Sequence, residues 1–394
     1  MPSGELAAAL GKAPAGMTRL EASVIESEDA QLLAALSGVL RFPEQFFTMQ
    51  PPPPLSDGQL LFRAPKSTTK REKSYLAELA RLVGEFLHWV QDKHPLPPVR
   101  LPTFGSDTPP AAAAMEVRSA IGCEEGPIPF LTHPIERMGV VVAVRSRTAT
   151  PEILEQDNAG AAWSSSADER HLGYSTWTGE FRERPVIFMR SIDSWERTRW
   201  TLAHEVGHLC LHYRGVDANS EEQANHFANA FIAPADLIRP DIPKVVTLSS
   251  LVDLKMRWGI SISALIRHLH QSGFITDTRK DTLQKQLYTR KNPETGRTYG
   301  VDEPGWKAQT PERPRMLAEW LERTVGSANP NAVASLSGAW PADVLGGFLT
   351  EQRRRGPVRG SSTSQRSQRQ IHADAESRSS GQVIDLAARR AASS

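Results

Sequence analysis

Three observations predict an α+β fold that is mostly helical, with a small β-sheet flanked by helical segments. Helical hydrophobic periods cover much of the 394-residue chain, whereas strand patterns are confined to about residues 139–189. Hydrophobic residues make up 39% and charged residues 23% of the chain, as in a globular protein with polar connections. The sequence has no internal repeat at solenoid periods, which argues against a repeat architecture.

Charge and cysteine content narrow the class of protein. With 46 Lys+Arg against 45 Asp+Glu the formal net charge is +1, so the whole molecule is not a basic nucleic-acid coat. Two cysteines cannot make a disulfide framework, and the N-terminus lacks a basic segment followed by an apolar run. No stretch approaches the roughly 20 apolar residues that cross a bilayer. We therefore expect a cytoplasmic protein with no membrane partner.

In the first half of the chain, predicted helices are followed by predicted strands. Short helices are expected over about 5–10, 14–21 and 29–40, and the run Pro51–Pro54 is a stiff extended spacer. Beyond it the predicted elements are helices over about 70–92 and 111–121, and strands over 139–144, 172–178 and 186–189.

After Ser194 the helical period returns. The expected helices cover about 194–213, 221–232, 248–258, 261–271 and 276–288, with two more over 311–349. From residue 353 onward nine Arg face three acidic residues in a Ser-, Arg- and Gln-rich stretch. That composition predicts a disordered tail.

The motif HEVGH at residues 204–208 carries the most specific chemistry. Residues four apart share a helix face, so His204 and His208 present two imidazoles to one point, as a zinc site requires. Glu205 is turned by about 100° and projects beside the metal. Zinc lowers the pKa of its bound water from 15.7 to about 7, and Glu205 can take the proton as general base.

Catalytic zinc needs a third protein ligand, for which His212, Glu221, Glu222 and His226 are candidates. His212 lies on the same helix, and one straight helix rarely wraps three ligands around an ion. Glu221 shares a helix face with the small residue Ala224, whereas Glu222 is turned about 100° away. We choose Glu221.

The segment TLAHEVGHLCLH followed by EEQANHFANAFIAP resembles the ImmA/IrrE metallopeptidases over about residues 110–290. The resemblance implies a minimal zincin-like fold of the gluzincin type and cleavage of a helix-turn-helix repressor. It also implies His204, His208 and Glu221 as zinc ligands and Glu205 as the base. The transition-state proton donor is not identified, with Tyr174 and His226 as weak candidates.

The segment GELAAALGKAPAGMTRLEAS resembles part of an XRE-type helix-turn-helix, with Gly11 at the turn. Its first helix is missing, and only Lys12, Thr18 and Arg19 are available to contact DNA. Five parts are therefore predicted: a partial helix-turn-helix (1–50), a Pro-rich linker (51–69), a metallopeptidase domain ending in a helical trio (70–290), a small helical region (291–352) and a disordered basic tail (353–394).

Two functional hypotheses follow from these patterns. The leading one is a zinc-dependent endopeptidase that cleaves a protein partner, a transcriptional repressor, with a nearby strand holding the extended peptide by edge pairing. The alternative is a DNA-binding transcriptional regulator whose metal site is structural or sensory. A site closed by four protein ligands would favour the regulator, whereas an open coordination position would favour the protease.

Overall fold

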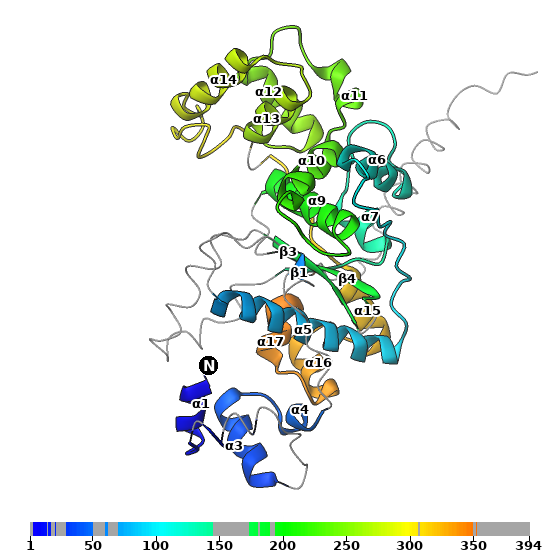
Figure 1. Ribbon diagram of the computed structural model, residues 1–394, viewed down its shortest axis with the longest axis vertical. Coiled ribbons are helices and arrows are strands. Elements are labelled where there is room, and N and C mark those ends of the chain that lie inside the picture. The colour runs from blue at the N-terminus through cyan, green and yellow to red at the C-terminus, as the bar shows by residue number, and fades with distance from the viewer. Residues whose placement is uncertain are drawn as a thin grey trace, which may run out of the picture. The chain divides into compact units, whose positions relative to one another are not determined.

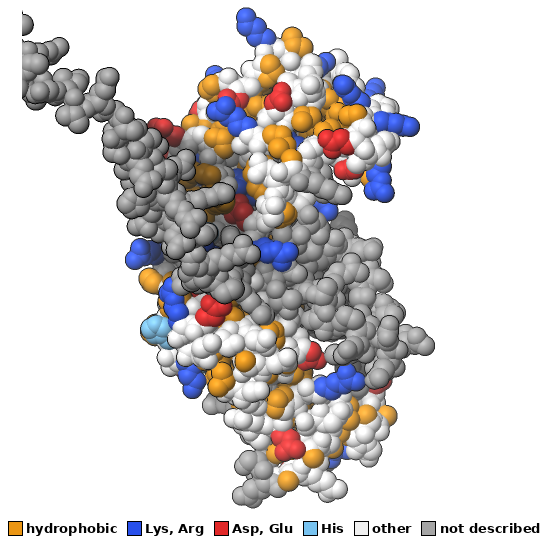
Figure 2. Space-filling model, turned by 180° about the vertical axis from the view of Figure 1, so that it is seen from behind, with side chains coloured by type: hydrophobic (Ala, Val, Ile, Leu, Met, Phe, Trp, Pro, Cys, Tyr) orange, Lys and Arg blue, Asp and Glu red, His pale blue; other side chains and the backbone are white. Residues whose placement is uncertain are grey.

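The computed structural model describes residues 3–13, 15–16, 20, 29–49, 60–61, 70–144, 173–179, 182–189, 194–305, 308–349 and 352 (Figure 1). All of them belong to the first of two units, Met1–Arg353. On the face shown in Figure 2, Lys and Arg side chains are interspersed with acidic and apolar ones. No helix among the described residues is both long and apolar enough to span a bilayer.

A four-stranded sheet lies at the centre of the structure, in the order β1-β3-β4-β2. Its strands are β1 (Leu60–Leu61), β2 (Val141–Val144), β3 (Gly173–Thr178) and β4 (Arg184–Met189). β3 and β4 form an antiparallel hairpin, whereas β2 runs parallel to β4. The three predicted strands are confirmed, and β4 begins two residues earlier than expected. β1 was not predicted, because it falls within the segment interpreted as linker.

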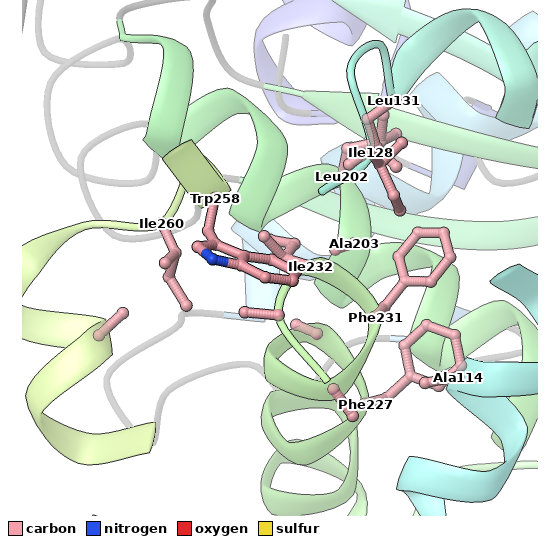
Figure 3. Packing of buried hydrophobic residues seen from close by; sticks show 14 of the residues in the cluster. Ala114, Ile128, Leu131, Leu202, Ala203, Phe227, Phe231, Ile232, Trp258 and Ile260 are labelled. Carbon is pink, nitrogen blue, oxygen red and sulfur yellow. The ribbon is translucent and has the colours of Figure 1, made fainter. Parts of the chain in front are cut away.

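Side chains alternate between the two faces of the sheet, and each face has its own core. Trp177 and Ile187 belong to the first core, which is completed by α6 (Pro110–Ala120), α9 (Trp195–Leu211) and α10 (Ser220–Ile232). Figure 3 shows Phe227 and Phe231 of α10 in this core, close to Ala114 of α6. The helices α6, α9 and α10 confirm those predicted over 111–121, 194–213 and 221–232.

The opposite face of the sheet carries the second core, to which Tyr174 and Phe188 contribute. α5 (Lys70–Lys93) covers it, as predicted, and Figure 1 shows this helix on the side of the sheet away from α9. Three helices complete it: α15 (Met316–Thr324), α16 (Pro330–Ser337) and α17 (Ala342–Leu349). The prediction of two helices over 311–349 was therefore wrong by one, because Gly338 in the left-handed region (φ 67°) separates α16 from α17.

The predicted helical trio is confirmed as α12 (Leu248–Trp258), α13 (Ile262–Gln271) and α14 (Asp277–Thr289). Each helix begins with a hydroxyl cap, because Thr247, Ser261 and Thr276 accept a backbone N–H through their side chains. Its core residues are continuous with those of α9 and α10. These helices therefore form part of the same packed body as the motif helix.

Shorter helices complete the described chain: α1 (Ser3–Ala9), α3 (Ala30–Leu40), α4 (Glu44–Thr48), α7 (Thr132–Arg137), α11 (Ala235–Ile238) and the 3₁₀ helix η3 (Arg239–Asp241). α1 and α3 agree with the predicted helices over 5–10 and 29–40. Gly11 lies in the left-handed region (φ 61°), as a turn requires. Most of the helix predicted over 14–21, the spacer 51–54 and the tail 353–394 lie outside the described residues.

Candidate metal centre

The motif helix α9 is held rigidly where it enters the site. Ser194 caps its N-terminus by accepting a hydrogen bond from the Arg197 N–H at 3.2 Å. Trp200 stacks on the His204 ring with a centroid separation of 5.0 Å. Its indole N–H donates to Asn229 Oδ1 of α10 at 3.3 Å. These contacts restrict the rotation of His204 before any ligand binds.

α10 approaches α9 closely because small residues line their contact. A Cβ added at Gly207 would lie 3.0 Å from the Phe227 ring, so α9 has no room for a side chain there. Ala224 and Ala228 of α10 are fully buried. This close packing brings the first turn of α10, which carries Glu221, up to the two motif histidines.

The structure brings together the three residues predicted as metal ligands. His204 Nε2 and His208 Nε2 lie 3.1 Å apart. The Glu221 carboxylate lies 3.6 Å from the first of these nitrogens and 3.3 Å from the second. One potential ligand atom from each residue falls within 4.8 Å of the others. Among the described residues, these three form the group of donors placed to hold a metal ion.

The donor set fits zinc. Burial and the neighbouring His208 lower the pKa of His204 to about 3, with Glu221 opposing them, so this ring is a neutral donor. Two nitrogens each about 2.05 Å from a tetrahedral zinc would be about 3.3 Å apart, close to the 3.1 Å between the two Nε2 atoms. Two imidazoles and one carboxylate are a common protein ligand set of catalytic zinc.

His212, the rejected ligand candidate, orients His208 instead. Its Nδ1 atom lies 3.0 Å from His208 Nδ1, and its Nε2 atom lies 2.8 Å from Gln223 Oε1. An amide oxygen can only accept, so His212 carries its proton on Nε2 and accepts from His208 Nδ1–H. The remaining lone pair of His208 is then on Nε2, which faces Glu221. This is the tautomer that metal binding needs.

Glu205 does not belong to the ligand cluster but faces the start of β3. Ser175 Oγ donates to Glu205 Oε2 at 2.9 Å, and a Cβ at Gly173 would lie 3.1 Å from Glu205 Oε1. Burial raises the pKa of Glu205 to about 7, although His208 and the Ser175 hydrogen bond oppose the rise. A carboxyl group with this pKa can both take and return a proton near neutral pH.

The other candidates lie elsewhere. Glu222 and His226 pair with each other at 4.0 Å on the exposed side of α10. Tyr174 is stacked on Phe188 at 4.6 Å in the second core, on the opposite face of β3 from Ser175. Of the predicted DNA-contacting residues, Lys12 is exposed. The other two, Thr18 and Arg19, lie outside the described residues.

Sequence reasoning missed Gly173, Ser175 and Gln223. Ser175 could have been predicted, because it lies one position from Tyr174 on a predicted strand and therefore faces the opposite side of the sheet. Gln223 could not have been, because its role depends on how α9 and α10 pack.

A family model described as Peptidase_M78, IrrE N-terminal-like domain, matches residues 156–270. The match spans β3, β4, α9 and α10 and therefore includes the whole His-His-Glu cluster together with Glu205 and Ser175. It lies within the range 110–290 over which the resemblance to ImmA/IrrE proteins was predicted, and it supports a peptidase. No curated protein matches the chain.

Proposed function

We propose that this protein is a zinc-dependent endopeptidase that cleaves a protein partner. The observation that carries the proposal is the convergence of His204, His208 and Glu221 beside a buried carboxylate, Glu205. Three protein donors leave a fourth position for water or substrate, which is typical of catalytic rather than structural zinc. The match to a peptidase family over the same residues supports it.

The chemistry of the site divides among the residues that surround it. Zinc bound to the cluster would supply Lewis acidity, which polarises a peptide carbonyl and makes water more acidic. Glu205 takes a proton from water and later delivers it to the leaving amine, and its burial, which raises its pKa, makes it a stronger proton acceptor. Ser175 holds one carboxylate oxygen through its hydroxyl, so that the other oxygen is oriented for this transfer.

The substrate backbone is proposed to lie along β3, beside Glu205. β3 pairs with β4 on one side and, within the described residues, with Leu60 and Leu61 of β1 on the other. An extended peptide would replace β1 along this edge. The chemistry fits a segment of a protein that can adopt an extended conformation, and we propose a helix-turn-helix repressor as that partner.

The test is Glu205→Gln, assayed with purified, zinc-loaded protein on candidate repressors by mass spectrometry of the products. Losing the proton acceptor is expected to reduce cleavage by about 10²- to 10⁴-fold while zinc content is unchanged. Glu222→Gln, the same chemical change on the exposed face of α10, is the matched control and should cleave normally. Equal cleavage by the Glu205→Gln variant and the wild type would refute the mechanism.

The alternative, a DNA-binding regulator with a structural or sensory metal, is favoured by the left-handed Gly11 after α1, where a helix-turn-helix would turn. Against it, the described residues bring three donors rather than four to the cluster. A mobility-shift assay with the full chain and a Lys12→Ala variant separates the two proposals. DNA binding that depends on Lys12 would support the regulator.

A further inference from the structure

A second concave site lies in the structure, built from residues that take no part in the metal centre. A cavity of about 290 Å³ opens between the loop that precedes α6, helix α7 and helix α15. Its walls include four arginines from these separate segments, together with one histidine and one tryptophan: Arg100, Arg137, Arg315, Arg323, His133 and Trp320. Its size is at the lower end for small-molecule sites, which suits a small compound rather than a polymer.

Within the described part of the chain, the two carboxylates of the cavity leave three of its four arginines without an ion pair. Both oxygens of Glu136 accept backbone N–H groups of Arg315 and Met316, at 3.0–3.2 Å. Burial raises the pKa of Glu136 to about 7, which reduces its charge further. Glu319 lies 3.8 Å from Arg315 Nε and is the partner of that arginine. Neither carboxylate forms an ion pair with another arginine of the cavity.

Three of the four guanidinium groups are therefore available to a ligand. Arg100, Arg137 and Arg323 are exposed, and within the described ranges none has a carboxylate oxygen within 4.0 Å. Arg323 lies over the Trp320 ring at 5.5 Å, a contact made by the face of the guanidinium that does not use its N–H groups. Forked guanidinium groups pair with phosphate and carboxylate oxygens through two parallel hydrogen bonds. Their convergence on one cavity creates a local positive potential that the near-neutral total charge conceals.

The remaining walls are preorganised. His133 Nδ1 accepts a hydrogen bond from Arg315 Nε at 3.1 Å, so its ring N–H is on Nε2 and is a further donor. Trp320 is fixed by stacking on His94, at a centroid distance of 5.5 Å, and by donating its indole N–H to the His94 carbonyl. It thus offers a rigid apolar surface next to the cationic groups. His133 and Trp320 are therefore already ordered, so ligand binding costs free energy mainly in ordering the exposed arginine side chains.

We propose that this cavity binds a small dianion, either a phosphate monoester or a dicarboxylate, through Arg137, Arg323 and Arg100. The inference is independent of the peptidase proposal, because none of these residues touches the His-His-Glu cluster. The two ligand classes share the chemistry that the site recognises, two negative charges a few ångströms apart. Binding measurements with one probe of each class distinguish them.

The experiment is isothermal titration of the full chain with inorganic phosphate and, separately, with succinate, at constant ionic strength. Saturable binding of at least one probe is expected, and the probe that binds identifies the class. Arg137→Gln should weaken that binding by about tenfold or more, since it removes a charge-assisted pair of hydrogen bonds. Arg267→Gln, which removes an exposed charge from α13, is the matched control and should bind as the wild type does.

Two results would overturn the proposal. One is the absence of saturable binding of both probes to the wild type up to about 10 mM, a concentration at which a weak specific site of millimolar affinity is occupied. The other is an equal loss of affinity in Arg137→Gln and Arg267→Gln, which would show a response to total charge. Arg137 is exposed, so its variant is expected to fold, and circular dichroism checks this. Arg323→Gln is the second variant and should reproduce the loss.

Discussion

Gln223→Met is expected to weaken zinc binding without unfolding the protein. The Gln223 amide oxygen accepts from His212 Nε2 at 2.8 Å, and His212 Nδ1 accepts from His208 Nδ1 at 3.0 Å. This sequence of hydrogen bonds keeps the Nε2 lone pair of His208 directed at the cluster. Methionine has a similar length and fills the same space, but it lacks the amide oxygen. His212 would then be free to adopt the other tautomer, which no longer accepts the proton of His208.

The magnitude follows from the position of the lost contact. Removing the hydrogen-bond partner of a metal-ligating histidine typically costs 10- to 100-fold in metal affinity, or about 1.4–2.7 kcal/mol. Gln223 is one residue further out, since His212 is the direct partner of His208 and is retained. We therefore expect a loss near the lower end of this range, about tenfold. His212→Phe, which removes the direct partner, should lose more.

The assay is competition for zinc between the apoprotein and a chromophoric chelator at fixed pH, which needs no substrate. Gln223→Glu keeps an acceptor for His212 and should retain the wild-type affinity to within a few-fold. Gln286→Met, the same chemical change at an exposed position of α14, controls for the substitution itself. The reasoning is wrong if Gln223→Met binds zinc as tightly as Gln286→Met, or if Gln223→Glu loses as much affinity as Gln223→Met.

Two further predictions concern buried charges outside the metal centre. The fold raises the pKa of Glu136 from its ordinary value of 4.5 to about 7. The contribution of protonated Glu136 to the unfolding free energy is therefore fully present below pH 4.5 and is lost as the pH rises through 7. Relative to Glu136→Gln, the wild type should lose about 3 kcal/mol of unfolding free energy across this window, and parallel pH profiles in urea denaturation would contradict this. Lys255→Met should cost about 3–5 kcal/mol, because Glu196 and Glu303, 2.9 and 3.0 Å from the buried amine, would lose their cation. Exposed Lys285→Met is its control, and equal denaturation midpoints for the two variants would refute the argument.

The period of the helix was sufficient to predict which residues would form the cluster. His204 and His208 are four apart, and Glu221 lies three residues before Ala224, which is buried against α9. Both spacings lie within a single helix, so a helical-wheel projection shows which of these residues share a face. The strands were predictable for the same reason, since β2 reads as a continuous apolar run and β3 and β4 are joined by a short loop.

The relations that depend on packing were not predictable. Gln223 reaches His212 because α9 and α10 cross closely where Gly207 meets Phe227, and no pattern within either helix specifies that crossing. Ser175 reaches Glu205 through the packing of β3 on α9. The arginine cavity combines residues more than 200 positions apart in the chain, so neither composition nor spacing could indicate it.

The segment matched by the peptidase family, residues 156–270, does not contain all the ion-pair partners of its buried charged residues. Lys255 pairs with Glu196 inside this segment at 2.9 Å and with Glu303 outside it at 3.0 Å, and the Glu303 carboxylate also accepts the N–H groups at the start of α13. Arg199 of the motif helix pairs at 3.0 Å with Glu312, which lies still further along the chain. A buried charge left without its partner costs several kcal/mol, a large fraction of the stability of a typical domain. The chain beyond residue 270 therefore stabilises the helix that presents His204 and His208, and the geometry of the metal centre depends on carboxylates outside the family match.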